Sequence, residues 1–491
     1  MFVVLSHNRF AIAMPYVKHQ GSEAGYLPPV VGAASVPPTQ VDVSYEGNWL
    51  WDQYQSNEPI AGVTPGQYVS FTCNPTFQAM TDVGQSFIYV QGYYLLENDI
   101  THANATADPA IGDKNVSVTA PPFLAACLFQ DVSMTINGTQ VVASQGIAQP
   151  YAMVSSIIKN LDSSDRDNGA LTEGFLLDPI ASTQITNVLN ASSAVRQRMT
   201  MQGAAATCAQ RPFGLVYRLT DAGLRTKGAW LPPNVNMNIR ARRTTANWMR
   251  LGVQGEVTNA NPVFTFTSAT AFIARKVLSE ASRGRLENIW ADQPLRVPFE
   301  RIRTSVNWYG AGAQDVNLSN QISGPTPSAV FVFVIQDAQM NGISTGSDNP
   351  MCLSPPCVTT VALPSPIAWQ NVSLSLGGSR QYPIQPLSML ANASPDITQS
   401  ASSTLDLGIL YQLYRACAND QPFLRDTDFT NIMPLCFPIT ASKDSWDAAE
   451  EVSISFKGRL SAQTPAAYSI LMVSFTDSLI EFTKEGQVIV T

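Results

Sequence analysis

The residues that could carry catalysis or bind a metal are few in this sequence and lie far apart. The 491 residues include only three histidines, His7, His19 and His102. A Ser-His-Asp triad or a Cys-His pair would have to use one of them. The sequence contains no G-x-S-x-G, H-E-x-x-H or Walker motif. We therefore predict no catalytic residues, no metal ligands and no cofactor.

The seven cysteines do not form a metal-binding or disulfide pattern. The closest pair, Cys352 and Cys357, is spaced C-x4-C around two prolines, with no second pair to complete a zinc site. An odd number in a long chain argues against a disulfide framework and favours a reducing compartment. Cys127 and Cys417 have apolar neighbours and are interpreted as small core residues.

Paired carboxylates are another possible source of chemistry, because glycosidases use two acids that face each other across a cleft. Asp426 with Asp428, and Glu450 with Glu451, are close only in sequence. We interpret them as residues of solvated loops or sheet edges. Glu481 lies in the last predicted strand and points away from its apolar neighbours, which predicts a place at a rim or an interface.

Aromatic clusters could indicate sugar binding. Trp49, Trp51 and Tyr54 precede the first predicted strand, and Trp308 and Tyr309 precede a Gly-rich loop. We favour packing at a sheet edge or a subunit contact, since aromatic anchors are enriched at buried interfaces.

The charge of the chain argues against a protein that coats nucleic acid. Its net charge is −8, whereas such proteins are usually basic. The densest basic patch consists of Arg240, Arg242, Arg243 and Arg250. We interpret it as a solvated strand edge, with a phosphate contact as the alternative, and predict no direct sequence-specific binding of nucleic acid.

Composition also points to assembly. Charged residues make up 13% of the chain, about half the usual share, which suggests that much of the surface is hidden against partners. The first residues are briefly apolar but lack a basic leader, so no signal peptide is expected. No apolar run approaches the roughly 18 residues of a membrane span.

The elements that must position these residues are mostly strands. β-branched and aromatic residues in alternating runs predict strands at residues 67–73, 86–95, 132–136, 140–142, 235–239, 263–266, 299–307, 330–335, 372–376, 452–456, 469–475 and 482–490. Asn137-Gly138 predicts a tight hairpin. Residues 151–161 and 405–417 have the apolar spacing of helices, each in a similar place in its half.

An all-β chain of this length should divide into two sandwiches. Residues 1–43, rich in Pro, Gly, Val and Ala, are predicted to be an N-terminal arm. The natural break lies near residues 279–288, which divides the remainder into 44–278 and 279–491.

Four segments of the chain follow one another in a characteristic order. Residues 122–138 (PFLAACLFQDVSMTING) run into a strand that ends in Asn-Gly, before the helix at 150–161. Residues 231–240 (LPPNVNMNIR) form a second segment. Residues 298–349 hold an apolar strand followed by DAQMNG at 337–342, next to Asn349-Pro350. The end contains YPIQP at 382–386 and SFTDSLIEF at 474–482.

In their order and spacing these segments resemble the double jelly-roll major capsid proteins of Polinton-type elements, adintoviruses and virophages. The resemblance covers most of the chain from about residue 85. It implies two tandem eight-stranded jelly rolls with a few short helices in the loops, and a structural role without enzymatic activity.

The same resemblance implies a homotrimer that acts as a pseudo-hexameric, hexon-like tile of an icosahedral shell around double-stranded DNA. The implied partners are neighbouring capsid trimers, penton proteins and minor or cement capsid proteins; an internal membrane is left open. The implied location is the virion, assembled inside the host cell without secretion.

Two other functions remain open from the residues alone. One is a receptor- or glycan-binding β-sandwich of a virion, such as a fibre, spike or lectin. The other is a secreted enzyme that degrades polysaccharides. Both predict a secretion signal or a paired-acid site, and the sequence pattern favours neither.

Overall fold

The computed structural model describes most of the chain from the first strand onward. The described residues are 45–60, 65–76, 78–96, 118–119, 123–170, 172–175, 211–244, 251–252, 262–340, 357–358, 365–366, 369–378, 380–387, 407–418, 422–424, 434–439, 452–460, 463–464 and 466–490. The predicted arm at 1–43 lies outside them.

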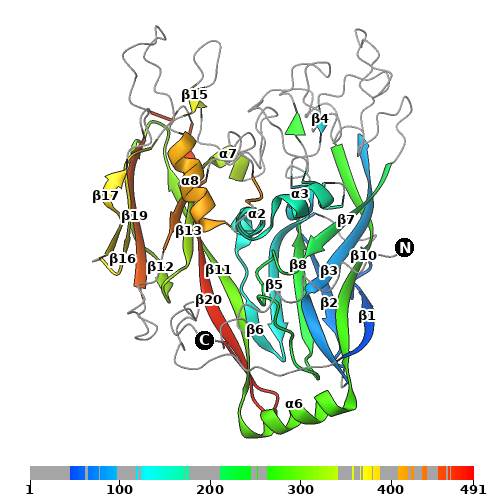
Figure 1. Cartoon of the computed structure of the whole chain (residues 1–491). Helices are drawn as coiled ribbons and strands as arrows, with labels where there is room; N and C mark the ends of the chain where they lie inside the picture. The colour runs from blue at the N-terminus through cyan, green and yellow to red at the C-terminus, as the bar shows by residue number, and fades with distance from the viewer. Residues whose placement is uncertain are drawn as a thin grey trace, which may run out of the picture.

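The N-terminal part of the chain forms two four-stranded sheets (Figure 1). One has the order β1 (Tyr45–Gln55), β10 (Pro262–Leu278), β3 (Ala79–Leu96) and β7 (Arg211–Arg218). The other has the order β2 (Tyr68–Cys73), β8 (Met237–Arg243), β5 (Phe129–Ile136) and β6 (Thr139–Val142). We call these two sheets the first roll.

The C-terminal part forms two more sheets, which we call the second roll. One has the order β11 (Leu295–Tyr309), β20 (Tyr468–Phe482), β13 (Ala329–Gln336) and β18 (Leu435–Pro438), with β21 (Val488–Val490) paired to β20. The other has the order β12 (Asp315–Gly324), β19 (Val452–Leu460), β16 (Trp369–Leu376) and β17 (Arg380–Leu387). Two short ladders pair β4 (Val118–Thr119) with β9 (Leu251–Gly252), and β14 (Cys357–Val358) with β15 (Ser365–Pro366).

The two rolls have the same topology. When the eight sheet strands of each roll are counted along the chain, both rolls pair them in the orders 1-8-3-6 and 2-7-4-5. All these pairs are antiparallel. Two such sheets packed face to face make a jelly roll. The chain therefore has the double jelly-roll fold, and the predicted fold class is confirmed.

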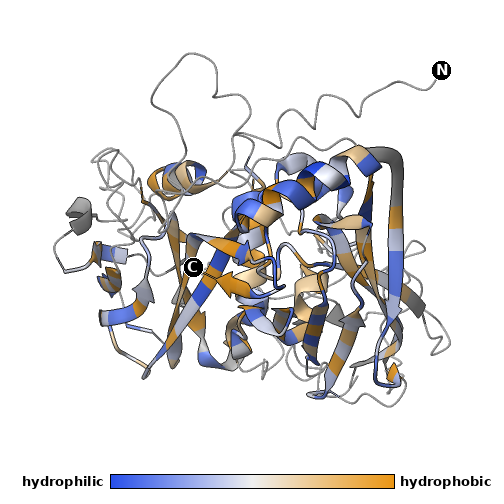
Figure 2. Cartoon of the chain, turned by 90° about the horizontal axis from the view of Figure 1, so that it is seen from below, coloured by the Kyte–Doolittle hydropathy of each residue, from blue (hydrophilic) through white to orange (hydrophobic). Residues whose placement is uncertain are grey.

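Side-chain patterns explain which strands lie at the centre. β8 alternates buried and more exposed residues, as a strand with one face on the core must. β20 is almost continuously buried because both of its faces are covered. Seen from below, the strands show this alternation as hydrophilic and hydrophobic bands (Figure 2).

Helices fill the connections. The short ones are η2 (Leu124–Cys127), η3 (Gly146–Ala148), α3 (Ser163–Asn168) and α7 (Asp337–Met340). The longer ones are α2 (Gln149–Asn160), α6 (Glu280–Asp292) and α8 (Leu407–Cys417). α2 and α8 each follow the fifth sheet strand of their roll and precede the sixth, so the similar placement predicted for the two helices is confirmed.

Several predicted boundaries were wrong. The aromatic cluster at 49–54 does not precede the first strand, because it lies in β1. The strand predicted at 482–490 is interrupted: β20 ends at Phe482, and a turn with Gly486 at φ +80° leads to β21. The break predicted near residues 279–288 stays a prediction. Helix α6, residues 280–292, lies there between β10 and β11, and it begins with the Ser279 side chain accepting from the Ser282 N–H.

Five sheet strands were not predicted at all: β1, β7, β12, β17 and β18. All five lie at the edges of their sheets, where one side of the strand has no paired neighbour among the strands described. Edge strands carry polar and irregular sequences because less of their surface is buried. Apolar alternation therefore identifies them poorly.

Candidate assembly site: the seam between the two rolls

Within the described part of the chain, no group of three or more His, Cys, Asp or Glu side chains is placed to hold a metal ion. None of the helices described is both long and apolar enough to cross a membrane. One group of converging polar side chains lies where the first and second rolls meet, a contact that we call the seam.

The middle of the seam is built around Glu300 of β11. Its side chain is 3% exposed and accepts hydrogen bonds from Lys159 Nζ at 2.5 Å and Asn160 Nδ2 at 2.7 Å. Both partners end helix α2 of the first roll. The Glu300 N–H also donates to the Arg225 carbonyl at 2.8 Å, which joins the two rolls through their backbones.

Cationic side chains of the first roll stabilise the negative charge of Glu300. Burial by itself would raise the pKa of the Glu300 carboxyl, but Lys159, Arg225 and Lys227 together lower that pKa below its ordinary value. Lys159 is also placed over the ring of Phe475 in β20, with Nζ 4.9 Å from the ring centre. A buried carboxylate with these donors is satisfied, whereas the same carboxylate without them would be costly.

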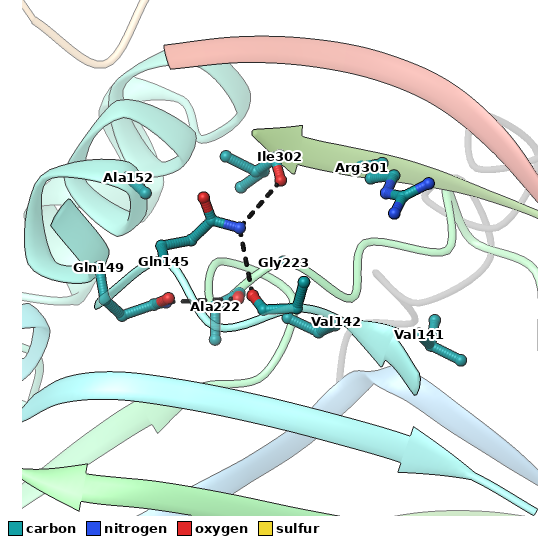
Figure 3. Close-up of a pocket in the computed structure, with 10 residues that line it drawn as sticks. Val141, Val142, Gln145, Gln149, Ala152, Ala222, Gly223, Arg301 and Ile302 are labelled. Carbon is teal, nitrogen blue, oxygen red and sulfur yellow. Dashed lines mark hydrogen bonds between the residues drawn. The ribbon is translucent and has the colours of Figure 1, made fainter. Parts of the chain in front are cut away.

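At Arg301 and Ile302 of β11 the seam contains a small, partly open cavity, with room for about one water molecule (Figure 3). Gln145, from the start of η3, connects its two walls. Its amide nitrogen donates to the carbonyls of Ala143 at 3.1 Å and Ile302 at 3.2 Å, and its amide oxygen accepts from Thr304 at 2.7 Å. One glutamine of the first roll therefore holds two residues of β11.

The ends of the seam are fastened by different contacts. At the tip of the β5–β6 hairpin, Asn137 Nδ2 donates to the Gly486 carbonyl at 3.0 Å, and Thr139 donates to the Val488 carbonyl at 3.0 Å. Lys227 forms an ion pair with Asp477 of β20. These contacts tie the C-terminal turn and β21 to the first roll.

At the other end, helix α8 meets helix α2. The Tyr414 hydroxyl donates to the Ile158 carbonyl at 2.8 Å and accepts from the Leu424 N–H at 3.0 Å. The ring of Phe423 packs against the rings of Phe123 and Phe175, whose centres are 5.9 and 5.3 Å away. The seam thus extends along the contact from the hairpin tip to the helices, which holds the two rolls at a fixed spacing.

The structure places the basic patch differently from its prediction. β8 is an interior strand between β2 and β5, so the prediction of a solvated strand edge was wrong. Arg240 stacks on the ring of Tyr68, Arg242 donates to the Gly66 carbonyl, and Arg243 is buried over Phe266. Arg250 lies outside the described residues. The three described side chains do not form one patch.

Glu481 was predicted at a rim or interface, and this stays a prediction. In the second roll it forms a mostly buried ion pair with Arg296 across β20 and β11, at 2.6 Å. The described cysteines agree with a core role: Cys127 is fully buried, and Cys417 packs partly buried against the core. The three histidines, Cys352 and the two acid pairs lie outside the described residues.

The aromatic clusters separate into buried and exposed members. Tyr309 stacks on Tyr468, with ring centres 5.3 Å apart, whereas Trp308 is half exposed. In β1, Tyr54 is part of a hydrogen-bond network with Asp52 and Arg275, and Trp51 is half exposed.

Sequence reasoning missed the residues of the seam. Most residues from 295 to 302 are buried, and Glu300 is one of them. A lone acid in such a stretch is the one local signal, since a buried carboxylate needs a partner. Nothing local identifies that partner, because Lys159 is 141 residues away.

Comparison with solved structures agrees with this fold. A chain from the cryo-electron microscopy structure of the Sputnik virophage matches with a TM-score of 0.60 at 11% identity, over 96% of this chain and 93% of that chain. The mavirus major capsid protein matches with a TM-score of 0.49 at 11% identity, over 96% of each chain. No protein-family model and no curated protein sequence matches.

Proposed function

We propose that this chain is the major capsid protein of a double-stranded DNA virus and has a structural role, not an enzymatic one. The observation that carries the proposal is the pair of rolls with one strand order, held side by side by the seam. A chain that repeats one fold at a fixed spacing is suited to tiling a surface. The likeness to a chain of the Sputnik virophage over almost the whole length supports the same function.

The proposed assembly is a homotrimer. Three copies, each with two rolls of the same topology, place six similar units around a threefold axis. The outline of such a trimer is nearly hexagonal, and hexagonal blocks cover the flat facets of an icosahedral shell. The rolls need similar footprints for this purpose, but not similar sequences.

The proposal includes an arm at 1–43, a first jelly roll at 44–278 and a second at 279–491. The sheet membership of the described strands supports this division, since no described sheet mixes strands from the two parts. Proposed partners are neighbouring trimers, penton proteins and minor or cement proteins. The proposed location is the virion, with assembly inside the host cell.

The mass of the purified protein in solution tests the trimer. Light scattering should give about 159 kDa, three times the 53.1 kDa of one chain. Negative-stain images should show a hexagonal outline. A protein that stays monomeric at every concentration tested would contradict the proposal.

A further inference from the structure

Two cysteines that are separated in the sequence meet where helix α8 packs against strand β18. Cys417 is the last residue of α8. It lies on the same side of the helix as the buried Leu410 and Tyr414, because positions 410, 414 and 417 follow the helical spacing. Cys417 is only partly buried, so it is the more accessible of the two cysteines.

Cys436 faces α8 from strand β18. The next residue, Phe437, packs its ring against Phe456 of the opposite sheet, with ring centres 6.2 Å apart, in the interior of the second roll. Successive side chains of a strand point to opposite faces, so Cys436 points away from that interior and toward α8. It is completely buried, and its sulfur lies 3.7 Å from the Pro434 carbonyl oxygen.

The two thiols interact directly. Burial raises the pKa of the Cys436 thiol well above its ordinary value, and Cys417, which is hydrogen-bonded to it, raises that pKa further. For the other two cysteines of the described residues, Cys73 and Cys127, burial also raises the thiol pKa, but no second thiol contributes. Cysteines can be bridged only where their side chains already approach each other, and Cys417 and Cys436 meet that condition.

We propose that Cys417 and Cys436 form a disulfide when the protein is exposed to an oxidant, and that this bond stabilises the end of the seam where α8 meets the first roll. The loop between the two cysteines contains Phe423, whose carbonyl accepts a hydrogen bond from Arg166 of α3 at 3.1 Å. The disulfide therefore closes around a segment by which the second roll holds the first.

The same bond fixes helix α8. The Tyr414 hydroxyl, one turn before Cys417, donates to the Ile158 carbonyl of the first roll and accepts from the Leu424 N–H. A disulfide in the last turn of α8 keeps this hydroxyl between its two partners. It also restricts the unfolded chain, because it closes the loop between positions 417 and 436.

A small disulfide such as oxidised glutathione is the oxidant. The Cys417 sulfur attacks one sulfur of the small disulfide and expels one thiolate, and Cys436 then attacks the sulfur of Cys417 and expels the second. The small disulfide is reduced to two thiols, which take up the two cysteine protons, while one protein disulfide forms. Cys417 reacts first because it is the more accessible, whereas the raised pKa of Cys436 keeps that thiol protonated until the mixed disulfide lies beside it.

The timing of the bond, but not the bond itself, rests on the proposed function. A capsid protein that assembles inside a cell does so where thiols stay reduced, and a particle outside the cell meets an oxidising medium. With both thiols free, the rolls fold and the shell assembles first. The disulfide then fixes the seam of the completed particle.

Oxidation of the purified full-length protein tests the bond. After incubation with oxidised glutathione, free thiols are alkylated and the unreduced peptides are identified by mass spectrometry. The wild type should give peptides joined through Cys417 and Cys436, its melting temperature should rise by roughly 3 °C, and reduction should reverse both changes. The matched control is C73A, which removes a buried cysteine of the first roll and should keep the bond and the temperature shift.

Two serine variants assign the roles of the two cysteines. C417S should show neither the bond nor the temperature shift, and C436S should stop at a glutathione adduct on Cys417; circular dichroism checks that both variants are folded. Alkylation of both cysteines in the oxidised wild type would overturn the inference, and so would a temperature shift that persists in C417S. A wild-type monomer that forms the bond would overturn the proposed trimer and leave the inference intact.

Discussion

Glu300 joins the two rolls through one carboxylate, and its environment explains why a charge is tolerated there. The side chain is almost completely buried, yet two donors reach it from the end of α2 and its N–H pairs with Arg225. Burying an ion is costly unless its partners are in place. The contact therefore favours one relative position of the rolls and penalises others.

Replacing this carboxylate should destabilise the protein. E300Q keeps the size of the side chain but leaves Lys159, 11% exposed, without its ionic partner. We expect the free energy of unfolding to fall by about 3 kcal/mol. The control is D315N, since Asp315 and Arg459 are 3.8 Å apart and largely exposed, and the change should be under about 0.5 kcal/mol. Urea unfolding measures both; equal effects would contradict the role of burial.

The same residue predicts a dependence on pH. Its pKa is lower in the folded chain than its ordinary value of 4.5. The folded state thus binds a proton less readily than the unfolded state, and Glu300 contributes stability that is fully present above pH 4.5 and lost as the pH falls through the folded pKa. The difference in unfolding free energy between wild type and E300Q should shrink below pH 4.5. A difference that stays constant down to pH 2 would contradict this.

At the scale of elements, two hairpin turns use the same local device: Asn137-Gly138 and Gly377-Gly378 are both pairs of residues at positive φ. Asn137-Gly138 was predicted from the sequence, whereas Gly377-Gly378 was not. In both, the turn brings neighbouring strands together with the twist that a sheet needs. In the first hairpin, Asn137 also reaches the second roll, so the turn serves the sheet and the seam together.

Two glycine substitutions separate backbone strain from packing. G138A places a side chain at φ +83° in open space, so it should destabilise by about 1 kcal/mol through strain alone. G284A lies within helix α6, also in open space, and should stabilise by roughly 0.5–1 kcal/mol, because alanine favours helix. Thermal unfolding measures the signs, and equal signs would contradict this account.

At the scale of the molecule, the low charge of the chain has an explanation that composition did not reveal. From the sequence, the low charge is attributed to a surface that is hidden against partners. Most outward residues of β12 show a second cause: Asn317, Ser319 and Asn320 are exposed but uncharged, and only Asp315 at the start of the strand carries a charge. Uncharged polar groups are cheaper to remove from water than ions. A surface of this kind suits a protein that packs against copies of itself.

The seam also predicts how the whole chain unfolds. Its contacts extend from Asn137 through Glu300 to Tyr414, so the two rolls should unfold in one transition, with equal calorimetric and van't Hoff enthalpies. A triple variant, N137A/E300Q/Y414F, should show two transitions. The control N320A changes an exposed residue and should keep one. Two transitions in the wild type would show that the seam does not couple the rolls.

The sequence by itself determined the features that depend on neighbouring residues. Alternating side chains indicated the interior strands, the 3.6-residue spacing of apolar residues indicated α2 and α8, and Asn137-Gly138 indicated a turn. The double jelly-roll class followed from the order of short segments. These inferences succeed because period and turn chemistry act within about ten residues.

Only the tertiary structure decided how the two rolls meet. Which residues of an edge strand such as β1 are buried depends on the elements that cover that edge. The sequence of an edge strand therefore shows no clear apolar period. Glu300 acquires its role from Lys159, 141 residues earlier, and Tyr414 acquires its role from Ile158. Contacts between residues so far apart in the sequence form when strands pair and sheets pack. They cannot be predicted from the residues that neighbour each partner along the chain. For this reason the absence of catalytic motifs was readable from the sequence, whereas the seam was not.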